Sequence, residues 1–162
     1  FALNGSNEKQ SPNVEFISFE SKKATKSQAA ELGIAAGSPV FQIHNKLGLN
    51  KKFYIVDKII IPQEKFPGLT EEIFKGRANT IYNLYQNKYN IFITNCSEKL
   101  KAISADEKIS KLLNIPVNAP ILKINRIGQT YNNVTIELRT SYVHTSDIDY
   151  IHSQNSTFGE AI

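Results

Sequence analysis

The sequence predicts an α+β fold in which one antiparallel sheet is built from two related hairpins and small helices pack on it. Three observations support this prediction. A helix–turn–hairpin pattern runs from Leu32 to Pro62 and returns from Leu113 to Val143. The strands in both copies alternate apolar and polar residues imperfectly, so part of each sheet face is expected to be covered. The helical segments between them are short, and several begin with Ser or Thr.

The two copies share residues as well as pattern. Each second strand also carries one acid, Asp57 in the first copy and Glu137 in the second. We interpret this as a duplication, although any helix–turn–hairpin could share part of the pattern. Four residues recur at one constant spacing, Leu32, Ile34, Pro39 and Ile43 returning as Leu113, Ile115, Pro120 and Ile124.

In the first half, residues 14–19 alternate and predict a strand. Residues 22–32 have helical composition, and the glycine that follows them is a typical helix end. Residues 40–49 and 53–61 predict the first hairpin, with its bend at residues 50–52.

The middle of the chain predicts two further helices. Thr70 begins a short one over residues 70–75, with acids in its first turn. The next runs from Thr80 and is ended by Asn90. A long strand is then expected from Ile91 toward Ala102.

The second half repeats the first. A helix is expected over residues 104–113, with Ser104 as its cap and Glu107 at the capping-box distance. The second hairpin spans about residues 121–143, and residues 147–151 predict a final short strand.

Length and composition indicate one ordinary globular domain. The chain has 162 residues, 41% hydrophobic and 21% charged, and no apolar run long enough to span a membrane. Its one cysteine, Cys96, excludes an internal disulfide framework and fits the cytoplasm. Because the sequence contains no Met, we expect a fragment of a longer protein, with residues 1–13 a linker remnant and residues 152–162 a tail.

The net charge of +4 comes from scattered lysines and does not predict direct nucleic-acid binding. The three arginines, Arg77, Arg126 and Arg139, are far apart in the sequence. A nucleic-acid-binding face would need clustered basic residues. We therefore interpret the lysines as a solvated surface.

Catalytic and metal-binding patterns are weak. The histidines, His44, His144 and His152, lack metal-ligand spacing, and the chain has neither a Gly-rich phosphate loop nor a nucleophile elbow. Asp57 and Glu137 could act as an acid–base pair, but lone strand acids more often orient a ligand. We expect no catalytic residue, no metal and no cofactor.

The segment around Thr80 is the best anion-site candidate. Free backbone N–H groups from Asn79 through Ile81 to Tyr82 would point outward at the start of the helix, beside the Thr80 hydroxyl. Arg77 could supply a full positive charge from the preceding loop. The alternative is that Thr80 is simply a helix cap.

These features together resemble the UTRA domain, the effector-sensing half of HutC-type regulators in the GntR family of bacterial transcription factors. The resemblance covers residues 14–151 in order. The matching pieces are Ala29–Ile34 with Gly37–Val40, Phe53–Pro62 with Phe66–Leu69, Thr80–Tyr89, Leu112–Leu122 and Glu137–Asp147.

The resemblance implies a chorismate lyase-like fold, a homodimer, and an upstream winged helix-turn-helix domain that binds operator DNA. It implies a role in transcription regulation, as a repressor, with a small effector such as a sugar phosphate or another small acid. An enzyme of the chorismate lyase type and a ligand-free dimerisation domain remain as alternatives.

The resemblance also implies site residues. Thr80 matches the residue that contacts the effector's anionic group, and Glu137 and Asp57 match acids that hold its polar groups. Arginines common in the family fall at Asn45 and Leu47 here, and another falls near His144. The missing positive charge would then come from Lys46, Arg77, Arg126 or His144.

Overall fold

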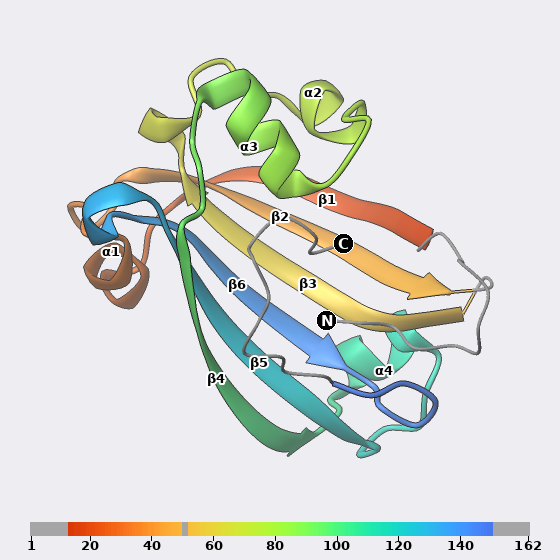
Figure 1. Cartoon of the computed structure of the whole chain (residues 1–162). Coiled ribbons are helices and arrows are strands. Elements are labelled where there is room, and N and C mark those ends of the chain that lie inside the picture. The colour runs from red at the N-terminus through yellow and green to blue at the C-terminus, as the bar shows by residue number, and fades with distance from the viewer. Residues whose placement is uncertain (1–12, 50–51, 151–162) are drawn as a thin grey trace.

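A six-stranded antiparallel sheet forms the body of the structure, a computed structural model that describes residues 13–49 and 52–150. Its strand order is β1-β2-β3-β6-β5-β4 (Figure 1). The two central strands, β3 and β6, pair with each other. The strands are β1 (Asn13–Lys23), β2 (Pro39–Leu49), β3 (Lys52–Pro62), β4 (Asn95–Ser104), β5 (Pro120–Gln129) and β6 (Thr135–Val143).

The sheet consists of two halves with the same order of elements. The first is β1, α1 (Lys26–Leu32), β2 and β3, and the second is β4, α4 (Glu107–Leu113), β5 and β6. The repeated residues occupy equivalent places, because Leu32 and Leu113 end the two helices and Ile43 and Ile124 are buried. The antiparallel α+β fold built from two related hairpins is therefore confirmed.

Helices cover both faces of the sheet. We call the face under α2 (Glu71–Lys75) and α3 (Ile81–Tyr89) the inner face and the opposite one the outer face. On the inner face, Ile43, Ile59 and Ile61 pack with Phe74 and Tyr85. On the outer face, α1 and α4 pack in separate clusters against the sheet.

Threonine and aspartate side chains fix where the helices begin. Thr25 and Gln28 form a capping box at α1, and Thr70 and Thr80 each accept a backbone N–H at the start of α2 and α3. Asn90 ends α3 with φ 54°, in the left-handed region. The predicted starts and ends of α2 and α3 are confirmed.

Two predicted helix starts were wrong. The first helix begins at Lys26, because Lys22 and Lys23 still pair with β2 as the end of β1. The cap of α4 is Asp106, which accepts from the backbone N–H of Ile109 at 2.8 Å, because Ser104 is still part of β4. In both cases the preceding strand runs further than its alternation predicts.

Two predicted strand segments were also wrong. Residues 91–94 form no strand: Ile91 and Ile93 pack against the inner core, and β4 begins at Asn95. Residues 147–150 form no strand either, although Ile148 is buried against the end of the sheet. Ile151 and the predicted bend at Asn50 and Lys51 lie outside the described residues.

Candidate functional site

A buried carboxylate lies at the centre of the inner face. Glu137 on β6 is 0% exposed, and each of its oxygens accepts two hydrogen bonds. Arg139 donates from Nε to Oε1 at 2.9 Å and from Nη2 to Oε2 at 3.1 Å. From α3, Tyr85 donates to Oε2 at 2.7 Å and Tyr82 to Oε1 at 3.2 Å. These donors offset the cost of burying the charge.

Arg139 connects Glu137 to a second buried acid. Its Nη1 lies 3.6 Å from Oδ2 of Asp57 on β3, and Ser141 donates a hydrogen bond to the other oxygen of Asp57. Residues 137, 139 and 141 are two positions apart along β6, so their side chains point to the same face of the sheet. The ladder pairs Asp57 with Ser141 and Ile59 with Arg139, which brings the two acids to the same cation.

A second ion pair borders this cluster. Arg126 on β5 lies opposite Arg139 and donates to Glu98 on β4 at 2.6 Å. Cys96 lies 3.8 Å from the Tyr82 hydroxyl, and Gly128 lies opposite Glu137. The site therefore contains three carboxylates and two guanidinium groups.

Burial controls the protonation of the central groups. Burial raises the pKa of Asp57, and the attraction of Arg139 only partly offsets this. Burial lowers the pKa of Arg139, but the neighbouring carboxylate of Glu137 more than compensates, so its pKa rises. Burial and the charge of Glu137 raise the pKa of both Tyr82 and Tyr85. The tyrosines are thus neutral donors and the arginine remains charged.

Asn45 adds an acceptor without a donor. It lies opposite Asp57 in the ladder between β2 and β3 and is 1% exposed. Its Oδ1 has no hydrogen-bond partner among the described residues. Such an atom is costly to bury and can accept a hydrogen bond from a donor on a ligand.

The predicted residues around Thr80 lie at the start of α3. The Thr80 hydroxyl accepts from the backbone N–H of Asn83 at 3.2 Å, so it serves as the helix cap. Arg77 donates to the carbonyl of Phe74 at 2.6 Å and stacks over that ring. Asn79 is exposed, and Ile81 packs against the inner core.

Two further predicted residues also lie away from the Glu137 cluster. Lys46 belongs to the outer face, where it pairs with Glu15 at 2.8 Å and lies over the Phe53 ring. His144 follows β6, and its ring nitrogen lies 3.3 Å from the Ser146 hydroxyl. Asn45, Asp57, Tyr82 and Glu137 do come together, with Arg126 beside them.

Sequence reasoning missed four residues of the site. Arg139 lies two residues after Glu137, and this strand spacing could have placed it on the same face. Tyr85 lies three residues after Tyr82 on one helix, which also predicts a shared face. Ser141 carries the same strand signal, because it lies four residues after Glu137. Glu98 carries none, because its position depends on strand register.

Neither a cluster of metal ligands nor a membrane-spanning helix is found in the part of the chain that the structure describes. Among residues 13–49 and 52–150, no three His, Cys, Asp or Glu side chains are grouped to hold a metal ion. None of the helices described there is long and apolar enough to span a bilayer.

A match to a known family shows which kind of domain contains this site. The sequence model of the UTRA domain matches residues 7–149. The chain belongs to the UTRA domain family. The cluster around Glu137 is therefore a buried polar centre within a UTRA domain, and the chorismate lyase-like fold class is confirmed. A comparison with curated protein sequences finds no significant match.

Solved structures agree with this assignment. The ligand-binding domain described for a GntR-family transcriptional regulator of Bordetella bronchiseptica has 26% identity and a TM-score of 0.90, over 95% of each chain. The effector domain of PhnF from Mycobacterium smegmatis has 19% identity and a TM-score of 0.77, over 88% of each chain. The C-terminal domain of YurK from Bacillus subtilis has 20% identity and a TM-score of 0.75, over 85% of this chain and 93% of that one. This UTRA domain thus shares its fold with the regulatory domains of GntR-family regulators.

Proposed function

We propose that this UTRA domain senses a small effector for a bacterial GntR-type regulator of the HutC subfamily. It works in the cytoplasm, forms a homodimer, and acts within a repressor whose upstream winged helix-turn-helix domain binds operator DNA. The family match and the Bordetella bronchiseptica relative, described as a ligand-binding domain, support this proposal.

The observation that carries the proposal is the hydrogen bonding of Glu137 beneath α3. The hydroxyl groups of Tyr82 and Tyr85 donate to a fully buried carboxylate. A ligand hydroxyl or ammonium group has the same donor chemistry and can replace either of them. Asn45, with its unpartnered acceptor, offers a further contact on the same face.

Charge favours a particular kind of ligand group at this centre. Three carboxylates against two guanidinium groups leave no surplus of positive charge, so the centre favours a hydroxyl or an ammonium group. A sugar phosphate or another small acid would place its anionic group at the start of α3. There the backbone N–H groups near Asn79 and Thr80 and the charge of Arg77 would receive it.

The mechanism is a shift between two conformations. A ligand that replaces the tyrosine hydroxyl groups must displace Tyr82 and Tyr85, and both belong to α3. The effector would therefore favour a state in which α3 has moved relative to the sheet. In a dimer, such a shift changes how the two DNA-binding domains fit their half-sites.

A thermal-shift screen of sugar phosphates, sugars, amines and small acids tests the proposal. We expect at least one compound to raise the melting temperature and to change operator binding by the full-length regulator. The proposal fails if no compound stabilises this domain while operator binding by the full-length regulator is also unaffected by all of them.

One observation favours a ligand-free dimerisation domain as the second candidate. Both oxygens of Glu137 already have two donors each, so the cluster is satisfied without a ligand. The same screen separates the two functions. We propose that the domain is not an enzyme; pyruvate release from chorismate that disappears in Glu137→Gln would contradict this.

A further inference from the structure

A hollow with a mostly apolar lining lies on the outer face, away from Glu137. It has a volume of about 350 Å³ and lies between α4 and the first two strands. Pockets that bind small molecules begin at about this size. We call it the outer cleft; it is lined by Ile17, Ser18, Glu20, His44, Lys108, Lys111 and Leu112.

A β-bulge shapes the strand side of the outer cleft. In β1, Phe16 pairs with Asn45 but Ser18 pairs with His44, so Ile17 is the extra residue. The bulge turns the consecutive residues Ile17 and Ser18 to the same face, which regular alternation would prevent. Ser18 Oγ then lies 3.0 Å from Nδ1 of His44. The cleft thus gains an apolar and a polar group side by side.

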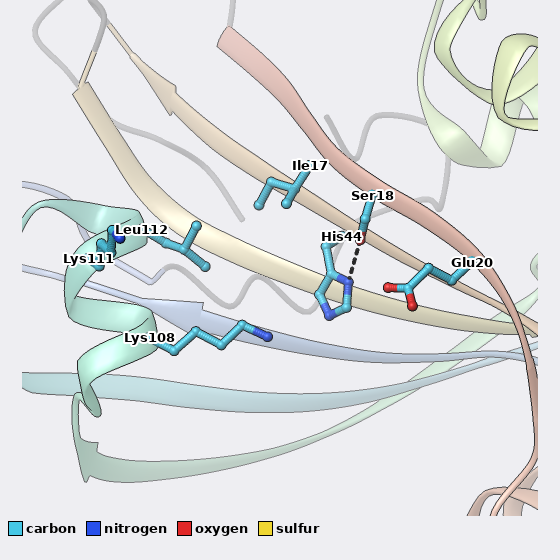
Figure 2. Close-up of a pocket in the computed structure, with 7 residues that line it drawn as sticks. All are labelled: Ile17, Ser18, Glu20, His44, Lys108, Lys111 and Leu112. Carbon is cyan, nitrogen blue, oxygen red and sulfur yellow. Dashed lines mark hydrogen bonds between the residues drawn. The ribbon is translucent and has the colours of Figure 1, made fainter.

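The helix side supplies positive charge. Figure 2 shows Lys108 reaching from α4 toward His44, with Leu112 on the same helix and Ile17 on the facing strand. Lys58 lies beside His44 as its ladder partner on β3.

The positive charge of the outer cleft is not neutralised. Within residues 13–49 and 52–150, Lys58, Lys108 and Lys111 have no carboxylate within 4.0 Å. Glu20 is the acid that lines the cleft, and Lys22 already pairs with it at 2.9 Å. Burial and the charges of Lys22, Lys108 and Lys123 lower the pKa of Lys58. These lysines repel one another, and a bound anion would relieve that repulsion.

We propose that the outer cleft binds a small organic phosphate with a short apolar portion. The phosphate dianion lies near Lys108, Ser18 and His44, where the lysine and hydroxyl groups donate to it. The apolar portion lies against Ile17 and Leu112. This site is independent of the proposed effector site, which is on the inner face.

Titration of the 162-residue domain with butyl phosphate, followed by NMR of the backbone amides, tests the proposal. Inorganic phosphate and butanol each supply only half of the ligand and serve as comparison probes. We expect saturable shifts at the amides of β1, β2 and α4, and weaker binding of both comparison probes. Lys108→Ala should weaken butyl phosphate binding by at least about tenfold, the effect of losing one charge-assisted contact.

Lys88→Ala is the matched control, because Lys88 is also an exposed helical lysine but belongs to α3. It should leave the affinity unchanged, and both variants should keep the wild-type melting temperature. Shifts that do not saturate, shifts confined to α3 and β6, or equal weakening by Lys88→Ala would overturn the proposal. Inorganic phosphate that binds as tightly as butyl phosphate would overturn it as well.

Discussion

Asp57 and Glu137 share one cation, Arg139, although they come from different halves of the sheet. Arg139 makes two hydrogen bonds to Glu137 and a longer ion pair, 3.6 Å, to Asp57. The two acids that the repeated pattern singled out are therefore coupled through a third residue.

Removing the charge of Glu137 should destabilise the domain strongly. Glu137→Gln leaves Arg139 buried, with Asp57 at 3.6 Å as its remaining acidic partner among the described residues. Breaking a buried pair this way costs about 3–5 kcal/mol. Urea unfolding measures the change. The exposed Glu31→Gln is the control, with an expected effect within about 0.5 kcal/mol.

The double variant Glu137→Gln with Arg139→Gln tests whether these two residues stabilise the domain as a pair. Because it removes both buried charges, it should lose less stability than the two single variants added together. Simple additivity would show that the two residues are not coupled in solution.

Two tyrosines on α3 should respond oppositely to the same substitution. Tyr85→Phe removes a 2.7 Å hydrogen bond to a buried carboxylate and should cost about 1.5–3 kcal/mol. Tyr89 has a buried hydroxyl with no partner among the described residues, so Tyr89→Phe should be neutral or stabilising by about 1 kcal/mol. Urea unfolding of both variants checks this. Equal losses would contradict the hydrogen bonding described for α3.

Asp57 should make stability depend on pH. Its pKa is higher in the folded state than the ordinary 3.8, so the folded state holds this proton more tightly than the unfolded chain. The stability that this provides is complete below the ordinary pKa and is lost as pH rises through the raised value. Asp57→Asn has no such proton, so its unfolding free energy relative to wild type should increase over that interval.

Urea unfolding of wild type and Asp57→Asn from about pH 4 to about pH 7 measures this difference. The comparison cancels the other titrating groups, which both proteins share. A difference that stays constant with pH would mean that the pKa of Asp57 is not raised by folding.

The sequence predicted which helices and strands form better than it predicted where each one begins and ends. Hydrophobic alternation and the recurrence of Leu32 and Ile43 located both hairpins, because these features depend on local pattern. It placed the start of α1 too early, because pairing with β2 extends β1 through Lys23. Tertiary pairing of this kind leaves no local signal in the strand itself.

The dependence on strand pairing also explains which residues of the site were predicted and which were not. Glu137, Asp57 and Tyr82 were predicted, from the repeated pattern and from the resemblance. Arg139 was noted only as one of three scattered arginines, because its role depends on β3 and β6 being neighbours. Lys46 was expected at the site, but the strand alternation directs it to the outer face, where Glu15 pairs with it.

Gly128 allows the proposed effector site to be blocked without disturbing the fold. A Cβ added there would meet Glu137 Cβ and the Tyr82 hydroxyl at 3.5 Å, which is ordinary van der Waals contact. Gly128→Ala should therefore keep the fold and gain about 0.4–1 kcal/mol of stability. The added methyl group would occupy the space that a ligand needs beside Glu137.

Calorimetric titration of the screen's best compound into wild type and Gly128→Ala tests the central claim most directly. If the effector binds at Glu137, wild type should bind it and Gly128→Ala should bind it at least about tenfold more weakly, despite equal or greater stability. Equal affinity in the two proteins would contradict the claim that the cluster around Glu137 is the effector site.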